Sequence, residues 1–282
     1  MPDIDLIDKS LDRENTQNYH LSIQADLNGF SFCILDIKKR TYIGLRHYHF
    51  EKVYNIDDYA DRVTELFKRD KLIGLRYKSS FFVYLTQKST LIPESFFNES
   101  NLKAYFEFNQ SLNELDEIHY NFLSEINAYN IFAIPNYIVN EIVNRIENVN
   151  LFHQATPFIK IIVKRGINKE NKYVYVNMNN KFIDIAVAAR NSLYLYNTFQ
   201  FQNENDLLYF VLYIYKQLNL DTRKNKLFIT GEQSDNIKYQ NALNKYITTV
   251  EYLGPIKFLF SSIFERINKH KFLNLFNLVS CA

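Results

Sequence analysis

The sequence has 282 residues, a length that suits one large domain or two medium ones. Apolar residues make up 47% and charged residues 23%, which predicts a globular chain with a sizeable core and excludes general disorder. The 33 basic and 31 acidic residues are well mixed and leave a net charge of +2, so the sequence lacks the one-sign basic stripe that binding to a nucleic-acid backbone requires.

Cysteine usage and hydropathy define the expected setting. Cys33 and Cys281 are far apart and lack the C-x-x-C spacing, so we expect neither a metal site nor a disulfide framework, and a reducing, cytoplasmic location. The N-terminus, MPDIDLIDKSLDREN, is acidic and has no long apolar run, which is unlike a signal peptide. The most apolar window, residues 207–214, is far below the ~20 residues that span a bilayer.

The first predicted unit begins after residues 1–18, which are polar, lack periodicity and are expected to form a mobile lead-in. Residues 19–50 alternate between apolar and polar and contain Asn28-Gly29, a dipeptide typical of two-residue hairpins. They predict three antiparallel strands, at 20–26, 30–37 and 41–50.

Further elements follow in the first half. Apolar spacing predicts a helix from Asp57-Asp58 to about Lys68 and a strand at 80–86. Residues 91–119 are harder to assign and leave room for an inserted subdomain. Beyond them the pattern predicts strands at 118–123 and 129–134, a helix opened by Pro135, and a helix at 158–164 closed by Gly166.

The second half follows the same order. Residues 173–201 again predict three strands, with Asn179-Asn180 at the first turn. A helix at 204–218 is apolar nearly all round, which predicts burial between layers or cover by a partner. The remaining predicted elements are a strand at 226–230 that ends in Gly231, a polar helix at 235–246, a strand at 248–252 and a Phe-rich tail.

The two halves align at an offset of 152 residues, which places Asp26 on Met178 and Asn28 on Asn180. Three antiparallel strands, a helix, a strand and a further helix describe a ribonuclease-H-like unit. We therefore predict an α/β protein with two such units, at 19–165 and 166–282, the first carrying the insertion near 91–119. Two unrelated α+β domains are the alternative, because the repeat rests on the order of elements rather than on residue identity.

Four segments carry a family resemblance: LSIQADLNGFSFCILD, TLIPESFF, NIFAIPNYIVNEIV and the tail ending FNLVSCA. On these segments the chain resembles an uncharacterised family from Bacteroidota, a domain of unknown function for which an actin-like ATPase fold is expected. The resemblance covers most of the chain from Tyr19 onward. Residues 131–165 are more distantly similar to actin-like assembly proteins such as PilM and FtsA.

The resemblance implies a nucleotide cleft lined by the first hairpin of each half. Asp26 matches an acidic residue that holds Mg²⁺ through water, and Gly29 permits close approach of a phosphate. The second hairpin has neither a carboxylate nor a glycine, which argues against hydrolysis. Plain hairpin turns are the simpler interpretation of both sites. The candidate cleft residues are Asp26, Asn28, Gly29, Asn177, Asn179, Asn180 and Gly231.

Other chemistry has weaker support. His47 and His49 lie on one face of a predicted strand, but the sequence places no third ligand beside them, which favours ordinary core or surface histidines. A nuclease would require several carboxylates around two metal ions, and only Asp26 and Asp184 lie in the meanders.

These patterns favour a non-catalytic, actin-like binding or scaffold module with a degenerate cleft and no catalytic residues. The Phe-rich tail (258–276) and the apolar helix (204–218) are its candidate surfaces for a protein partner or self-association, although core packing explains both as well. The alternative is a weak ATP-binding protein or ATPase that uses ATP and Mg²⁺ at Asp26 and Gly29.

Overall fold

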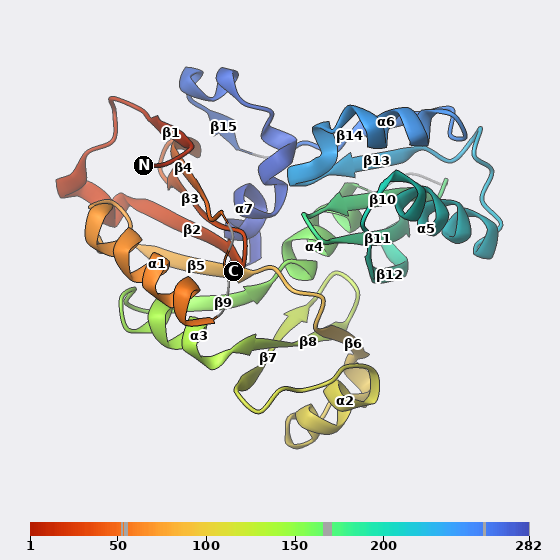
Figure 1. Ribbon diagram of the computed structural model, residues 1–282, viewed down its shortest axis with the longest axis horizontal. Helices are drawn as coiled ribbons and strands as arrows, with labels where there is room; N and C mark the ends of the chain where they lie inside the picture. The colour runs from red at the N-terminus through yellow and green to blue at the C-terminus, as the bar shows by residue number, and fades with distance from the viewer. Residues whose placement is uncertain (52, 54–55, 166–170, 256–257, 282) are drawn as a thin grey trace.

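The structure, a computed structural model, describes residues 1–51, 53, 56–165, 171–255 and 258–281, and its strands form three sheets (Figure 1). The largest sheet has the order β1-β4-β3-β2-β5-β9, with β15 also paired to β4. Its strands are β1 (Ile4–Ile7), β2 (Tyr19–Asp26), β3 (Gly29–Asp36), β4 (Thr41–His49), β5 (Ser79–Tyr84), β9 (Val149–His153) and β15 (Leu259–Phe260).

The second sheet has the order β12-β11-β10-β13-β14, and a small third sheet has the order β6-β8-β7. The second sheet consists of β10 (Tyr173–Met178), β11 (Phe182–Ala189), β12 (Ser192–Gln200), β13 (Leu227–Thr230) and β14 (Val250–Tyr252). The third consists of β6 (Ser89–Pro93), β7 (Asp116–Leu123) and β8 (Ala128–Pro135). The helices are α1 (Ile56–Arg69), α2 (Leu102–Asn109), α3 (Asn136–Val143), α4 (Ala155–Arg165), α5 (Glu204–Gln217), α6 (Ile237–Asn244) and α7 (Leu273–Asn277).

The two large sheets share one arrangement of strands. In each, a three-stranded antiparallel meander is followed by two strands that run parallel to its first strand. In the first sheet β2 pairs in parallel with β5, and β5 with β9. In the second sheet β10 pairs in parallel with β13, and β13 with β14. The meander strands predicted from residues 19–50 and 173–201 agree with the observed ones within a few residues. The strand β9 is absent from the sequence-based prediction, since residues 148–150 look like a turn in isolation.

The third sheet lies between β5 and α3 in the chain, where the sequence leaves room for an insertion. The predicted strands at 118–123 and 129–134 pair with each other, and the second of them also pairs with β6. In Figure 1 this sheet, with α2 beside it, projects from the edge of the molecule below the first sheet. The long insertion therefore separates β5 from α3 without breaking the order of the first sheet.

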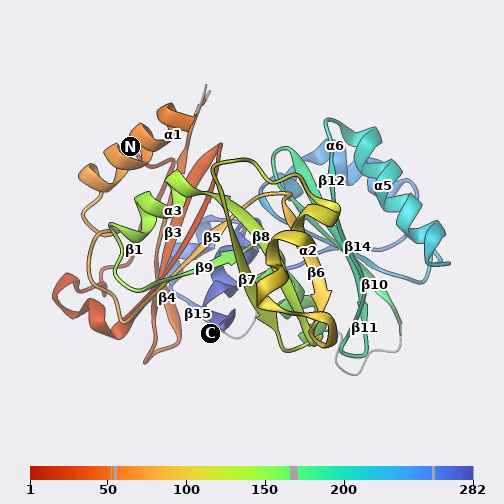
Figure 2. The ribbon, with the colours of Figure 1, turned by 90° about the horizontal axis from the view of Figure 1, so that it is seen from below.

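Each large sheet buries an outer face under two helices (Figure 2). Alternate residues of β3 explain how, since Phe30, Phe32 and Ile34 pack under α1 and α3 while Cys33 and Leu35 point to the other face. On the second sheet, α5 buries Leu207, Val211, Ile214 and Tyr215 against β10 and β11. The α5 helix is therefore amphipathic in the structure, and its outer side exposes Tyr209 and Tyr213.

The inner faces are covered by segments that lie between the two sheets, α4 and the tail that includes α7 (Figure 1). The tail leaves the second sheet and returns to the first: β15 pairs with β4, and Phe264, Phe272 and Phe276 pack on the inner side of β3 and β4. The tail of the half predicted at 166–282 thus packs on the first sheet. Of the two interpretations of the Phe-rich tail, partner surface or core packing, core packing holds for Phe264, Phe272 and Phe276.

Residues 1–18 also differ from the prediction of an unstructured lead-in. Ile4–Ile7 forms β1, an edge strand antiparallel to β4, and residues 13–18 form a short 3₁₀ helix. A four-residue strand is too short to show periodicity in the sequence, and its stability comes from pairing with β4. The predicted helix-closing residue Gly166 lies outside the described residues. In the described part of the chain, none of the helices has the length and apolar character needed to cross a membrane.

The tail gives a stability prediction. Phe276 is 0% exposed in the core between α7 and the first sheet, whereas Phe108, on α2, is 86% exposed. We expect Phe276→Ala to lower the free energy of unfolding by about 3–5 kcal/mol, because it removes a large side chain from a closed core. Urea unfolding measures this change, and Phe108→Ala is the matched control with little effect. Equal loss in both variants would show that the tail does not pack on the first sheet.

Candidate functional site

The first hairpin has the compact geometry that its sequence predicts. The backbone N–H of Asn28 donates to Oδ1 of Asp26 at 2.7 Å, which folds the turn around the carboxylate. Gly29 pairs with Asp26 on one side and with His49 on the other. A Cβ at Gly29 would lie 2.7 Å from the carbonyl oxygen of Tyr48, so only glycine fits. The glycine therefore serves close packing of β3 on β4.

The residue Asp26 is half-buried. The pKa of its carboxyl is raised to about 6, mainly by burial and secondly by the nearby carboxylate of Glu232. The N–H groups of Asn28 and Gly29 act in the opposite direction. Glu232 comes from the 3₁₀ helix Glu232–Asp235, which follows β13 in the second sheet. Each large sheet, with the helices on its outer face, is one lobe of the molecule. The two lobes thus bring the carboxylates of Asp26 and Glu232 together at the first hairpin.

The second hairpin turns its asparagine side chains inward. Asn177 and Asn179 donate from Nδ2 to Oδ2 of Asp184 at 2.8 and 3.4 Å. The other oxygen of this fully buried carboxylate accepts hydrogen bonds from the hydroxyls of Tyr196 and Thr198, both at 2.9 Å, and from Gln154 at 3.4 Å. Burial raises the pKa of Asp184 despite these donors. The amides of Asn177 and Asn179 are therefore committed to the protein interior and not to a ligand.

Asn180, the remaining residue predicted in this hairpin, hydrogen-bonds to the 3₁₀ helix Glu232–Asp235. Its Nδ2 donates to Oε2 of Glu232 at 3.0 Å, and its Oδ1 accepts from Nε2 of Gln233 at 2.5 Å. These bonds hold the Glu232 carboxylate in one orientation.

Gly231 is closed in by its neighbours. Its φ of +93° and ψ of 174° lie in a region that essentially only glycine occupies, and a Cβ would meet the backbone oxygen of Met178 at 2.6 Å. The N–H of Gly231 and the hydroxyl of Thr230 both donate to the carbonyl oxygen of His270, at 3.1 and 2.5 Å. This turn, which the sequence assigns to the candidate cleft, is thus packed against the second hairpin and the C-terminal segment.

The space beside these groups differs from one side to the other. A cavity of about 440 Å³ lies between β12, at Tyr196 and Thr198, and residues 87, 89–91 and 109–110. The space at the first hairpin is much smaller. A hollow beside the first hairpin offers about 10 Å³ to the centre of a water molecule, which is room for one water or ion. Its lining residues are Gln24, Asp26, Asn28, Gly29, Ser31, His47 and Glu232. Three predicted residues, Asp26, Asn28 and Gly29, therefore share one small site, whereas Asn177 and Asn179 are directed away from it.

The sequence alone does not predict Glu232 as a third potential metal ligand beside His47 and His49. Each of these three residues offers one potential ligand atom, and the three atoms lie within 4.8 Å of one another. The H-x-H spacing on β4 places two imidazoles on one face of a strand, which is visible in the sequence. The carboxylate comes from a residue 183 positions after His49, and only the fold brings it there.

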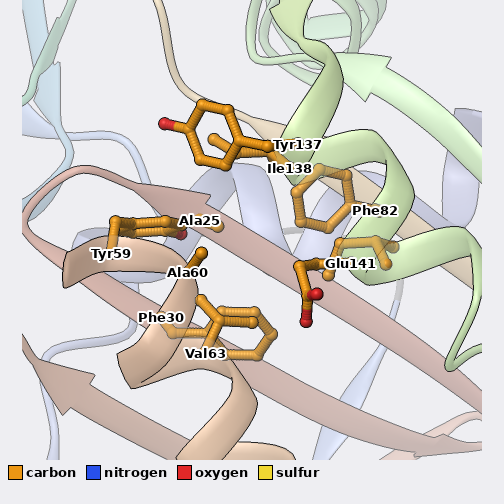
Figure 3. Close-up of a pocket in the computed structure, with 10 residues that line it drawn as sticks. Ala25, Phe30, Tyr59, Ala60, Val63, Phe82, Tyr137, Ile138 and Glu141 are labelled. Carbon is orange, nitrogen blue, oxygen red and sulfur yellow. The ribbon is translucent and has the colours of Figure 1, made fainter. Parts of the chain in front are cut away.

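A separate pocket lies between α1, α3 and the first sheet (Figure 3). Its lining is almost entirely apolar, with the rings of Phe30, Tyr59, Phe82 and Tyr137 around it. Like the hollow at the hairpin, it offers about 10 Å³ to the centre of a water molecule. An apolar gap of this size is a packing defect in the core and does not suit a nucleotide.

The arrangement of two sheets, each with a meander followed by two parallel strands, is that of the actin-like ATPase fold. The chain aligns with a Bacteroides thetaiotaomicron protein of actin-like ATPase fold and unknown function at a TM-score of 0.81 and 24% identity, over 96% of this chain and 99% of the other. The chain belongs to the DUF3822 family, described as a protein of unknown function, which it matches over residues 8–250.

More distant structures share the fold at lower identity. PilM in the PilM–PilN type IV pilus biogenesis complex aligns at a TM-score of 0.62 and 8% identity, over 93% of this chain and 97% of the other. The ethanolamine utilization protein EutJ from Carboxydothermus hydrogenoformans aligns at 0.53 and 8%, over 98% and 93%. Among curated proteins, none matches the sequence. These findings confirm the family resemblance and the fold predicted from the sequence.

Gly231 gives the first prediction from this site. Gly231→Ala should lower the free energy of unfolding by at least about 2 kcal/mol, because alanine cannot adopt this backbone conformation without strain and its Cβ would overlap Met178. Thermal or urea unfolding measures the change. Gly74→Ala is the matched control, since a Cβ at Gly74 meets nothing within 4 Å, and its effect should stay within about 1 kcal/mol.

Asp26 gives a pH prediction. An unfolded Asp loses its proton near pH 3.8 and the folded Asp26 near 6, so between these values the folded protein binds more protons and its stability falls as the pH rises. Asp26→Asn should remove this dependence and raise the free energy of unfolding at pH 7.5 by about 1–2 kcal/mol.

Urea unfolding between pH 4 and 8 in metal-free buffer measures this difference. Asp61→Asn, at an exposed position of α1, is the control and should keep the wild-type pH profile. A wild-type profile in Asp26→Asn would contradict the raised pKa.

Proposed function

We propose that this protein is a non-catalytic, actin-like binding or scaffold module whose nucleotide cleft is degenerate. The observation that carries the proposal is the hollow beside the first hairpin, which offers about 10 Å³ to the centre of a water molecule. Sites for small molecules and cofactors have volumes of about 300–1,000 Å³. At the first hairpin, the described groups that would contact phosphates pack against one another instead.

The committed hydrogen bonds of the second hairpin support the same proposal. A phosphate site requires backbone N–H groups or cations that face the ligand. Here the amides of Asn177 and Asn179 serve Asp184, and Gly231 donates to His270. Opening a cleft would break these contacts and leave the Asp184 carboxylate buried without two of its donors, which is costly.

We further propose that the two sheets descend from a duplicated ribonuclease-H-like unit. Their common strand order supports this interpretation. The first unit would comprise residues 19–165 with the third sheet inserted, and the second would begin near residue 166 and end before the returning tail. The two unpaired cysteines support a role in the reducing cytoplasm.

Exposed aromatic side chains support a binding role. The outer side of α5 exposes 63% of Tyr209 and 47% of Tyr213. On the inserted subdomain, Phe96 and Phe108 are 73% and 86% exposed. Large exposed rings are typical of protein-interaction surfaces. PilM, a protein with the same fold, was solved in a complex with PilN, which shows that this fold serves assembly in another protein.

A thermal-shift titration with ATP and Mg²⁺ tests the proposal. A ligand that binds only the folded state raises the unfolding midpoint. Because we expect no nucleotide to bind, we expect no shift of the wild-type midpoint at millimolar ATP. A shift that disappears in Asp26→Ala would replace the scaffold proposal with the alternative, a weak ATP-binding protein or ATPase that uses Asp26. Asp26→Ala is preferable to Gly29→Val, because any Cβ at Gly29 overlaps the Tyr48 carbonyl.

A further inference from the structure

His47, His49 and Glu232 form a cluster at the junction of the two lobes. The histidines lie on β4 of the first sheet, and Glu232 begins the 3₁₀ helix that follows β13 of the second. One ligand atom from each lies within 4.8 Å of the other two. Among the described residues, these are the His, Cys, Asp and Glu side chains that come together in a group of three with ligand atoms close enough for one metal ion.

Two of these residues are held in orientation by neighbours. Nδ1 of His47 lies 2.8 Å from the hydroxyl oxygen of Ser31. When Nδ1–H donates to this oxygen, the lone pair of the imidazole is on Nε2. Among the described residues, Nε2 has no hydrogen-bond partner. Oε2 of Glu232 accepts from Asn180, which in turn accepts from Gln233. Metal-binding side chains are commonly fixed by such outer partners.

The surroundings suit a cation in size and charge. The hollow lined by Asp26, Ser31, His47 and Glu232 has room for one water or ion. Asp3 adds a further carboxylate, since its Oδ2 accepts the backbone N–H of His49 at 2.7 Å. Lys271 is a cation near His47. Asp3, Asp26 and Glu232 supply carboxylates that favour a bound cation.

We propose that His47, His49 and Glu232 bind a divalent transition-metal ion of the Zn²⁺ class at the junction of the two lobes. Two imidazoles and one carboxylate are the donor set that Zn²⁺ accepts, with a water or the Asp26 carboxylate in the fourth position. Mg²⁺ and Ca²⁺ prefer sites composed only of oxygen ligands and do not match two imidazoles.

Bound metal would connect the lobes. Zn–N and Zn–O distances of about 2.0–2.2 Å place tetrahedral ligands roughly 3.3–3.5 Å apart, which is closer than the 4.8 Å limit of the cluster here. Binding therefore brings the ligand atoms of His47, His49 and Glu232 closer together by side-chain rotation. The ion holds the two sheets together where a nucleotide lies in other proteins of the fold. This role is separate from nucleotide binding.

Isothermal titration of chelator-treated protein with ZnCl₂ tests the site. We expect one Zn²⁺ per chain for the wild type and no heat of binding with MgCl₂. His49→Ala and Glu232→Gln should each weaken Zn²⁺ binding at least about 100-fold, and Ser31→Ala, which loses an outer partner, about tenfold. His49 is exposed and glutamine retains the shape of Glu232, so both variants should fold, which circular dichroism checks.

His119→Ala is the matched control. His119 lies on β7 with Glu117 at 3.7 Å, a histidine–carboxylate pair far along the chain from the cluster, and its loss should leave Zn²⁺ affinity unchanged. Absence of Zn²⁺ binding by the wild type, or equal affinity in His49→Ala, Glu232→Gln and wild type, would overturn the proposal. Neither outcome depends on ATP, so the scaffold proposal and the metal proposal fail separately.

Discussion

The buried carboxylate of Asp184 is the interaction on which the junction of the two lobes depends. It is fully buried, and five side chains donate hydrogen bonds to it. Four of these donors belong to the second sheet, and Gln154 comes from the segment between β9 and α4. A buried charge without donors is very costly, so the network holds all of these groups in place at once. The second hairpin is rigid because its asparagines belong to this network.

This constraint determines what the junction can accommodate. With Asn177 and Asn179 directed inward, the hairpin packs on Gly231, and Gly231 packs on the C-terminal segment at His270. That segment also supplies the aromatic core on the inner side of the first sheet. Both faces of each large sheet are therefore covered, which explains the near-continuous burial of β3 and β11. At the first hairpin, these packed segments leave room for only one water or ion.

The groups that remain at the junction have a different chemistry from phosphate binding. Asp26, His47 and Glu232 line a space for one small ion, and His49 has a ligand atom within 4.8 Å of those of His47 and Glu232. Asn180 orients the Glu232 carboxylate. The second hairpin contributes the Asn180 side chain to this site through its hydrogen bond to Glu232, which lies beside the first hairpin. The junction is thus a contact that stabilises the relative position of the lobes.

The sequence by itself determined the local elements and their order. Alternating apolar residues and the Asn28-Gly29 turn were sufficient for both meanders, because strand period and turn preference are local properties. The lack of acidic and glycine residues at Asn177–Asn180 was also readable directly. Only the tertiary structure decided where distant segments meet: β1 and β9 owe their existence to pairing, and the tail is core because the first sheet has an uncovered face. Glu232 reaches His47 and His49 for the same reason, since a contact between residues 183 positions apart is set by packing of the sheets and leaves no periodic signal in the chain.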